Sequence, residues 1–236
     1  MNQLNSIIEQ CEAVWEDWND QGVAGRIALL QRWSDTVSAR GEAFADAAKM
    51  IRFQCDNAER LLDKVHELPG PTGETNELYT VGRGTFAITG DASLTHVALC
   101  GQLAAALVAG NCVVVSVEGT HTDMADAVLA DLVKAGCPDR VAIRVDLDTN
   151  APLLAHPNIV GLATTGTLTH VRDVNRQLAQ RQGVIAALVA ESDTQLYPVI
   201  GAPDYVLRFV TERTRTINIT AVGGNATLLE LGSGEH

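Results

Sequence analysis

Cysteine and histidine side chains are the first candidates for chemistry, because thiolates are nucleophiles and both side chains bind transition metals. The chain has five cysteines and six histidines. The number of cysteines is odd, no C-x-x-C pair occurs, and no histidine stands at metal-ligand spacing, so neither a disulfide framework nor a metal site is predicted. We expect reduced, mostly buried thiols at Cys11, Cys55, Cys100, Cys112 and Cys137.

A glycine pattern at residues 82–87, GRGTFA, matches the dinucleotide fingerprint G-x-G-x-x-A. In that fingerprint the glycines follow a strand and open a helix, so that backbone amides face the phosphates. Here they precede a strand expected at 85–89, and only Gly90 and Asp91 follow that strand. Because a carboxylate repels an anion, the pattern predicts no phosphate site. A nucleophile elbow, G-x-S-x-G, is also absent from the sequence.

The elements that could position functional groups begin with a helical segment over residues 1–67. Apolar residues recur there at spacings of three and four, which indicates amphipathic helices. Trp15, Trp18 and Trp33 are better explained as core or interface anchors than as a stacking platform. Residues 68–74, LPGPTGE, place two prolines and two glycines close together and predict a boundary loop.

Short apolar runs then alternate with longer amphipathic ones up to residue 209. Runs such as residues 112–115, CVVV, are apolar on both faces, which is typical of a parallel sheet covered by helices on each side. The sequence therefore predicts an α/β fold with a doubly wound, mostly parallel Rossmann-like sheet. Strands are expected at 85–89, 113–117, 141–145, 159–163 and 184–190, and helices at 94–109, 123–135 and 168–182.

The last part of the chain changes character. A helix is expected at 204–212, and alternating β-branched and polar residues over 215–220 predict a strand exposed on one face. Such a strand invites pairing with another chain or domain. We therefore predict a helical segment at 1–67, a Rossmann-like core at 68–209 and a docking or oligomerisation tail at 210–236.

Composition excludes several classes of partner. The formal net charge is −12 and the isoelectric point is near 4.8, which argues against nucleic acid, because binding its phosphates needs a basic face. No apolar run is long enough for a transmembrane helix, and the first residues lack the order of a signal peptide. We expect a cytoplasmic protein.

Three stretches, read in order, resemble the aldehyde dehydrogenase superfamily: residues 104–115 (AAALVAGNCVVV), 135–138 (AGCP) and 164–167 (TTGT). They look like that family's helix, Ala-Gly-Asn turn and second Rossmann strand, its next helix end, and its Thr-Gly-Ser turn at a helix N-terminus. The likeness runs from about Val81 to Glu191. It implies the fold of the family's NAD-binding domain.

Two more stretches narrow the resemblance. Residues 68–76 (LPGPTGETN) and 213–226 (RTRTINITAVGGNA) look like segments of bifunctional proline-utilisation enzymes, which pair a proline dehydrogenase with a 1-pyrroline-5-carboxylate dehydrogenase. Longer members of that family carry an extra C-terminal domain that resembles a Rossmann domain without its catalytic partner. This chain is similar to that domain over nearly its whole length.

The resemblance implies no catalytic residue in this chain. An aldehyde dehydrogenase needs a thiolate nucleophile, oxyanion donors and a carboxylate that activates water. The family's cysteine lies on a domain inserted after the strand whose acidic residue is best matched by Glu191. Residues 192–236 contain no cysteine and leave little room for such a domain.

Cofactor binding is expected to be vestigial. In the family the second strand ends in Lys-Pro-Ser-Glu, whose lysine and glutamate hold the adenosine ribose. Here Ser116 stands in place of the lysine and Gly119 in place of the glutamate, and Glu118 is one position before Gly119. The turn persists as Thr165, Gly166 and Thr167, so a helix N-terminus could still offer amides to a pyrophosphate. We expect no bound cofactor, while the parent enzyme is expected to use NAD and FAD.

The leading hypothesis is a non-catalytic structural module of a proline-utilisation enzyme, whose tail docks on an aldehyde dehydrogenase domain of the same or a paired polypeptide. Docking would close a substrate channel or stabilise a dimer. The alternatives are a small NAD-dependent oxidoreductase and a nucleotide- or metabolite-binding protein. The expected docking residues are Thr216, Ile217, Asn218, Ile219, Thr220, Gly223, Gly224 and Asn225.

Overall fold

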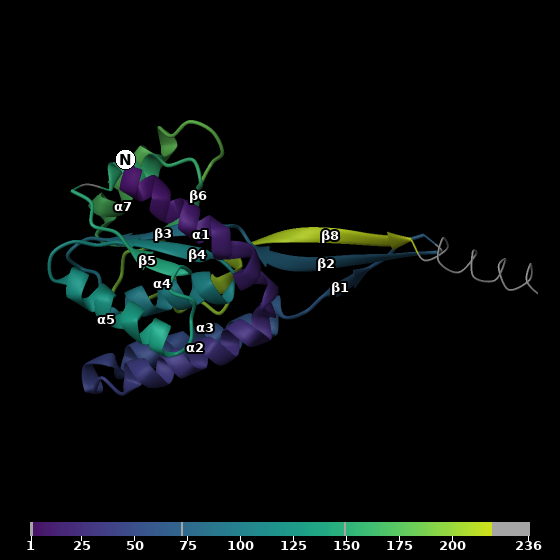
Figure 1. Ribbon diagram of the computed structural model, residues 1–236, viewed down its shortest axis with the longest axis horizontal. Coiled ribbons are helices and arrows are strands. Elements are labelled where there is room, and N and C mark those ends of the chain that lie inside the picture. Colours follow the sequence, from purple (N-terminus) through teal and green to yellow (C-terminus); the bar gives the residue numbers. More distant parts are fainter. Residues whose placement is uncertain (1, 72, 149, 219–236) are drawn as a thin grey trace, which may run out of the picture.

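A five-stranded sheet forms the centre of the molecule, which a computed structural model describes over residues 2–71, 73–148 and 150–218 (Figure 1). The strand order is β5-β4-β3-β6-β7, and every neighbouring pair is parallel. All residues of β4 are buried, as expected for a run that is apolar on both faces. The predicted doubly wound α/β fold is confirmed. The strands are β3 (Thr85–Gly90), β4 (Cys112–Ser116), β5 (Ala142–Arg144), β6 (Ile159–Thr165) and β7 (Ala187–Glu191).

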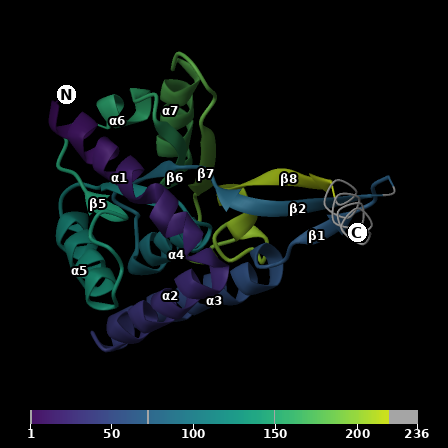
Figure 2. The same cartoon turned by 45° about the vertical axis from the view of Figure 1, so that its right-hand side comes forward.

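Helices cover both faces of this sheet (Figures 1 and 2). On one face lie α4 (His96–Val108) and α5 (His121–Lys134). On the other lie α6 (Ala151–Ala155) and α7 (Leu168–Ala179), with α1 (Asn2–Asp20) against β3 and β4. In the described part of the chain, no helix is long and apolar enough to cross a membrane.

Residues 2–62 are mostly helical, as predicted, and they add a further layer. The last of these helices ends at Leu62 and a strand begins at His66, so the helical part is shorter than the predicted 1–67. Helices α2 (Gly22–Ser38) and α3 (Ala45–Leu62) pack on α4 and α5, on the side away from the sheet. Trp18 and Trp33 are fully buried, which confirms that they are core anchors. These helices therefore share one hydrophobic core with the sheet domain.

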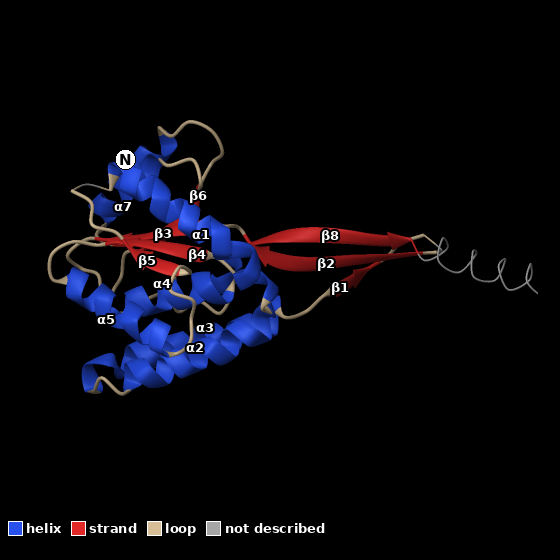
Figure 3. Ribbon diagram, in the orientation of Figure 1, coloured by secondary structure: helices blue, strands red, loops and turns tan. Residues whose placement is uncertain are grey.

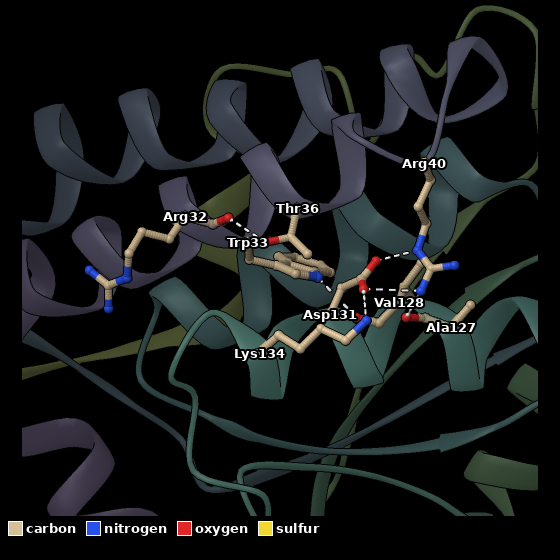
Figure 4. A network of polar contacts seen from close by, with 8 residues as sticks. All are labelled: Arg32, Trp33, Thr36, Arg40, Ala127, Val128, Asp131 and Lys134. Atoms are coloured by element: carbon tan, nitrogen blue, oxygen red, sulfur yellow. Dashed lines mark hydrogen bonds and ion pairs between the residues drawn. The ribbon is translucent and has the colours of Figure 1, made fainter.

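Helix α2 is tied to α5 by a polar network (Figure 4). Trp33 Nε1 donates to the carbonyl of Val128 at 2.9 Å. Arg40 holds the buried carboxylate of Asp131 through both Nε and Nη2, and Lys134 Nζ lies 3.2 Å from Asp131 Oδ1. Because every charge in the network has a partner, burial of Asp131 is compatible with a stable interface.

The Ala-Gly-Asn turn after α4 joins distant parts of the chain through Asn111, which is fully buried. Its Oδ1 accepts hydrogen bonds from the amides of Arg83 (2.7 Å) and Gly84 (3.2 Å). Its Nδ2 donates to the carbonyls of Ala106 (3.0 Å) and Phe209 (2.9 Å). All four bonds of a primary amide are thus used, and they join the residues before β3 to α4 and to Phe209.

A three-stranded antiparallel arm projects from the core (Figures 1 and 3). Its order is β1-β2-β8, with β1 at His66–Leu68, β2 at Glu74–Gly82 and β8 at Val210–Asn218. Most of the expected boundary loop, 68–74, falls between the end of β1 at Leu68 and the start of β2 at Glu74. The predicted division into 1–67, 68–209 and 210–236 stays a prediction, but β8 is paired with a strand of the preceding part.

The expected helix at 204–212 is wrong. A short 3-10 helix spans Tyr205–Phe209, and β8 begins directly at Val210. Tyr205 and Phe209 point into the core, where their rings contact each other at 5.2 Å. The buried residues Tyr205, Val206 and Phe209 have the spacing of an apolar helix face, which explains the prediction. The β-branched residues from Val210 onward favour the strand.

Candidate functional site

A cleft of about 730 Å³ opens at the carboxyl ends of β3, β4 and β6. This is the edge at which doubly wound sheets bind ligands. Among the described residues that line it, none is Lys or Arg, so the cleft has a negative potential that disfavours phosphate. Its titratable residues are Asp91, Glu118, His121, Asp148, His170 and Asp173.

The carboxylate of Asp91 lies on the N-terminus of α7. Asp91 Oδ2 accepts hydrogen bonds from the amide of Thr167 (2.7 Å) and from its hydroxyl (3.0 Å). The same hydroxyl accepts from the amide of His170 at 3.3 Å and caps the helix. Because the free amides and the dipole at a helix N-terminus attract anions, Asp91 stands where an external anion would bind.

Strand pairing brings Asp91 to this position. Its amide donates to the carbonyl of Thr165 at 3.0 Å, continuing the pairing of β3 with β6. Ser93 fixes the other carboxylate oxygen, with its amide at 2.8 Å and its hydroxyl at 2.6 Å from Asp91 Oδ1. Burial alone raises the pKa of Asp91, but the hydrogen bonds from Ser93 and Thr167 outweigh it and lower this pKa to about 2. The group is therefore an anion at neutral pH.

Gly166 lies against both side chains of the site. A Cβ atom added at Gly166 would lie 2.4 Å from His170 Cδ2 and 2.9 Å from Asp91 Cγ. The space beside this backbone is thus already filled by the protein's own groups. Glycine is required here for the close approach of Asp91, not for an open cradle.

The structure brings three of the five expected cofactor residues together: Thr165, Gly166 and Thr167 form one turn. Thr165 is buried, and its hydroxyl accepts from Gln102 Nε2 at 3.0 Å. Ser116 is also buried and donates to Asn150 Oδ1 at 2.6 Å. Glu118 is exposed on the wall of the cleft. Thr165 and Ser116 are therefore engaged inside the protein.

Glu191, at the end of β7, is buried and holds a loop. Its Oε1 accepts from the amides of Ser192 (3.0 Å) and Asp193 (3.1 Å). Its Oε2 accepts from the amides of Val199 (2.9 Å) and Ile200 (3.1 Å). Both oxygens are saturated by backbone donors, so this carboxylate organises residues 192–200.

Comparison with known proteins places this architecture in a family. The family model for the aldehyde dehydrogenase family matches residues 45–196, more than half of the chain. The chain belongs to the aldehyde dehydrogenase family.

Two relatives in this family show which branches the chain resembles. N-succinylglutamate 5-semialdehyde dehydrogenase of Sphingopyxis alaskensis is 28% identical over 209 residues, which cover 80% of this chain and 43% of that protein. The bifunctional protein PutA of Rhizobium meliloti is 31% identical over 204 residues, which cover 85% of this chain and 15% of PutA. The chain thus spans less than half of the relatives it matches.

Solved structures agree with these relatives. A structure of proline utilization A (PutA) with proline bound in remote sites matches with a TM-score of 0.73 at 30% identity, covering 81% of this chain and 22% of that one. An NAD-dependent benzaldehyde dehydrogenase from Corynebacterium glutamicum matches with a TM-score of 0.70 at 17% identity over 80% of this chain, which shows the fold alone. The resemblance to proline-utilisation enzymes is confirmed.

The residues of this aldehyde dehydrogenase chain do not fit the family's dinucleotide. A pyrophosphate at α7 would have to displace Asp91 from Thr167, and it would enter a cleft walled by carboxylates. The ribose position that the resemblance assigns to Ser116 is buried and bonded to Asn150.

The family's thiolate chemistry has no support in the described cysteines. All five are free and buried, as expected. Burial raises the pKa of Cys11, Cys55 and Cys137 to about 12, which keeps these thiols protonated and unreactive. None of the five lines the cleft. Within the described ranges, no group of His, Cys, Asp and Glu is arranged to hold a metal ion.

Sequence reasoning identified Asp91 as a carboxylate beside the strand but missed its contact with Thr167. The two residues are separated by more than seventy positions, and only the adjacency of β3 and β6 joins them. The order of strands in the sheet was the missing information. Once β3 is placed beside β6, their carboxyl ends meet at the same edge.

Proposed function

We propose that this chain is a non-catalytic module of a PutA-type enzyme that pairs proline dehydrogenase with 1-pyrroline-5-carboxylate dehydrogenase. Its arm and the segment after it dock on an aldehyde dehydrogenase domain of the same or a paired polypeptide. Docking closes the substrate channel or stabilises a dimer. The observation that supports this role is the arm itself: β8 projects from the core and is exposed from Glu212 to Asn218.

Two properties suit the arm to docking. β8 is an edge strand, so half of its backbone groups face away from β2 and can pair with a strand of a partner. Its side chains are held on the surface, since Arg215 pairs with Glu77 and stacks over the ring of Tyr79 at 5.7 Å. Small isolated sheets gain stability from such a partner.

The expected docking residues fall partly within this arm. Thr216, Ile217 and Asn218 belong to β8, and Thr216 Oγ1 donates to Asn76 Oδ1 at 2.5 Å. The remaining expected residues, Ile219, Thr220, Gly223, Gly224 and Asn225, lie outside the described residues. They extend directly from the exposed end of β8 in the sequence.

The bonding of the acidic and thiol side chains supports the non-catalytic part of the proposal. Glu191 is committed to four backbone amides, and Asp91 is committed to the start of α7. The thiols are buried and protonated. We therefore propose that the chain alone oxidises no aldehyde and binds no cofactor, and that NAD and FAD belong to its partner domains.

The test uses the PutA-type enzyme that contains or binds this chain. Deletion of residues 216–226 should lengthen the lag before NADH forms from proline, or lower the mass of the particle from dimer to monomer by light scattering. The rate with added pyrroline-5-carboxylate should stay unchanged. Glu118→Gln, in the cleft away from the arm, is the control. An unchanged lag together with an unchanged mass would contradict docking.

A second candidate function is binding of a nucleotide or metabolite in the cleft. Its volume of about 730 Å³ is within the usual range for small-molecule sites, which favours this alternative. Calorimetric titration with NAD distinguishes it. Absence of heat at millimolar NAD would remove the small NAD-dependent oxidoreductase, and absence of ADP density at the helix end near Gly166 would remove the nucleotide-binding protein. Turnover of pyrroline-5-carboxylate by the isolated chain would overturn the non-catalytic proposal.

A further inference from the structure

We infer that Asp91 is a built-in substitute for a bound phosphate: its carboxylate fills the anion position at the N-terminus of α7 and so excludes nucleotides from the cleft. The inference concerns this helix end alone. It does not depend on where, or whether, the arm docks.

Asp91 occupies the start of α7 with one carboxylate oxygen and is anchored in its own loop by the other. One carboxylate oxygen takes the amide and the hydroxyl of Thr167, at 2.7 and 3.0 Å. The other takes the amide and the hydroxyl of Ser93, at 2.8 and 2.6 Å. An external phosphate would therefore have to compete with a carboxylate that is already in place and holds four hydrogen bonds.

Position, rather than total charge, distinguishes Asp91 from the other acids of the cleft. Glu118 lines the same cleft but is exposed after β4. Asp173 also lines it and forms an ion pair with Arg176 at 2.7 Å on the surface of α7. If only the negative potential excluded phosphate, removal of any one of these charges would have the same effect. If Asp91 fills the anion position, only its removal frees Thr167.

The test is anion binding by the full chain after Asp91→Ala. Inorganic phosphate is titrated against chloride at equal ionic strength, and the Tm and the Thr167 amide resonance are followed. At about ten times its Kd, phosphate should raise the Tm of the variant by roughly 3–5 °C and shift that resonance. The wild-type protein should show neither effect. ADP should bind the variant by calorimetry and not the wild type.

Two further variants keep the inference falsifiable. Glu118→Gln removes one charge from the same cleft and should gain no phosphate response. Asp91→Asn preserves the size of the side chain, should fold even where alanine does not, and should give a smaller gain than alanine. The inference is overturned if the wild type binds phosphate at Thr167, if Glu118→Gln gains as much as Asp91→Ala, or if neither Asp91 variant gains any response.

Discussion

Glu191 shows how an acidic residue expected from the family can be held by the protein's own backbone. The family resemblance places an acidic residue here that activates water, and this position keeps the acid. The structure gives the carboxylate four backbone amides, two for each oxygen. In this structure the carboxylate holds the loop from Ser192 to Ile200.

Glu191→Gln tests that role. In glutamine an NH2 group replaces one carboxylate oxygen and cannot accept hydrogen bonds from the two backbone amides that this oxygen held. At least two buried hydrogen bonds are therefore lost. We expect a decrease of about 2–4 kcal/mol in the free energy of unfolding, measured with urea. The amides of either Ser192 and Asp193 or Val199 and Ile200 should exchange with deuterium faster than in the wild type. Glu118→Gln, the same change on an exposed residue, should cost less than about 0.5 kcal/mol. Equal stability of the two variants would contradict the structural role.

At the scale of elements, the network between α2 and α5 gives an asymmetric prediction. The side chain of Asp131 is 2% exposed, whereas that of Arg40 is 30% exposed. Removal of Arg40 leaves the buried carboxylate of Asp131 with only Lys134 beside it. Removal of that carboxylate instead leaves Arg40 as a cation that water can reach. Arg40→Ala should therefore cost about 2–4 kcal/mol, and Asp131→Asn about 1–2 kcal/mol.

A double-variant cycle completes this test by urea unfolding. Arg40→Ala combined with Asp131→Ala should lose less stability than the sum of the two single alanine changes, because no unpaired charge remains. Lys49→Ala, in the exposed pair with Asp46, is the matched control and should change stability by less than about 0.5 kcal/mol. Additive losses at Arg40 and Asp131 would show that the two side chains do not act as a pair.

A helix or strand could be predicted from the sequence where its own residues carry the pattern that identifies it. The strands of the parallel sheet were found because their residues are apolar on both faces, as in β4, and the helices because of their spacing. β2 was missed, since Glu74–Gly82 is half-buried along almost its whole length and shows no alternation. Its stability comes from pairing with β8, a partner well over a hundred residues away. No local pattern carries that information.

The candidate site was only partly predictable for the same reason. The turn at Thr165–Thr167 was recognisable, because short motifs at helix starts have fixed chemistry. Its partner Asp91 is at the end of another strand, so the contact depends on strand order. The burial of Ser116 likewise depends on Asn150, which follows β5. The sequence thus predicted which residues belong to the site, whereas their hydrogen-bond partners depended on the order of the strands in the sheet.

At the scale of the whole molecule, the arm and the core are predicted to be energetically separable. The buried core includes Val210 at the root of the arm, whereas β1 and the outer part of β8 contribute no residue to it. His66 and Leu78 are paired neighbours across β1 and β2, so the chain can be closed there by a short linker. A variant that lacks residues 66–78, bridged by two glycines, and ends at Thr211 should keep the core.

This armless variant should unfold cooperatively, with a Tm within about 4 °C of the full chain. It should fail to bind the aldehyde dehydrogenase domain in size-exclusion chromatography. Deletion of α1 is the contrasting control, because Ile8, Cys11 and Trp18 are completely or almost completely buried in the core and their loss should abolish cooperative unfolding. If the armless variant also loses its cooperative transition, the arm is part of the folding unit. In that case the arm could not be attributed to docking alone, because a stable core would itself require the strand.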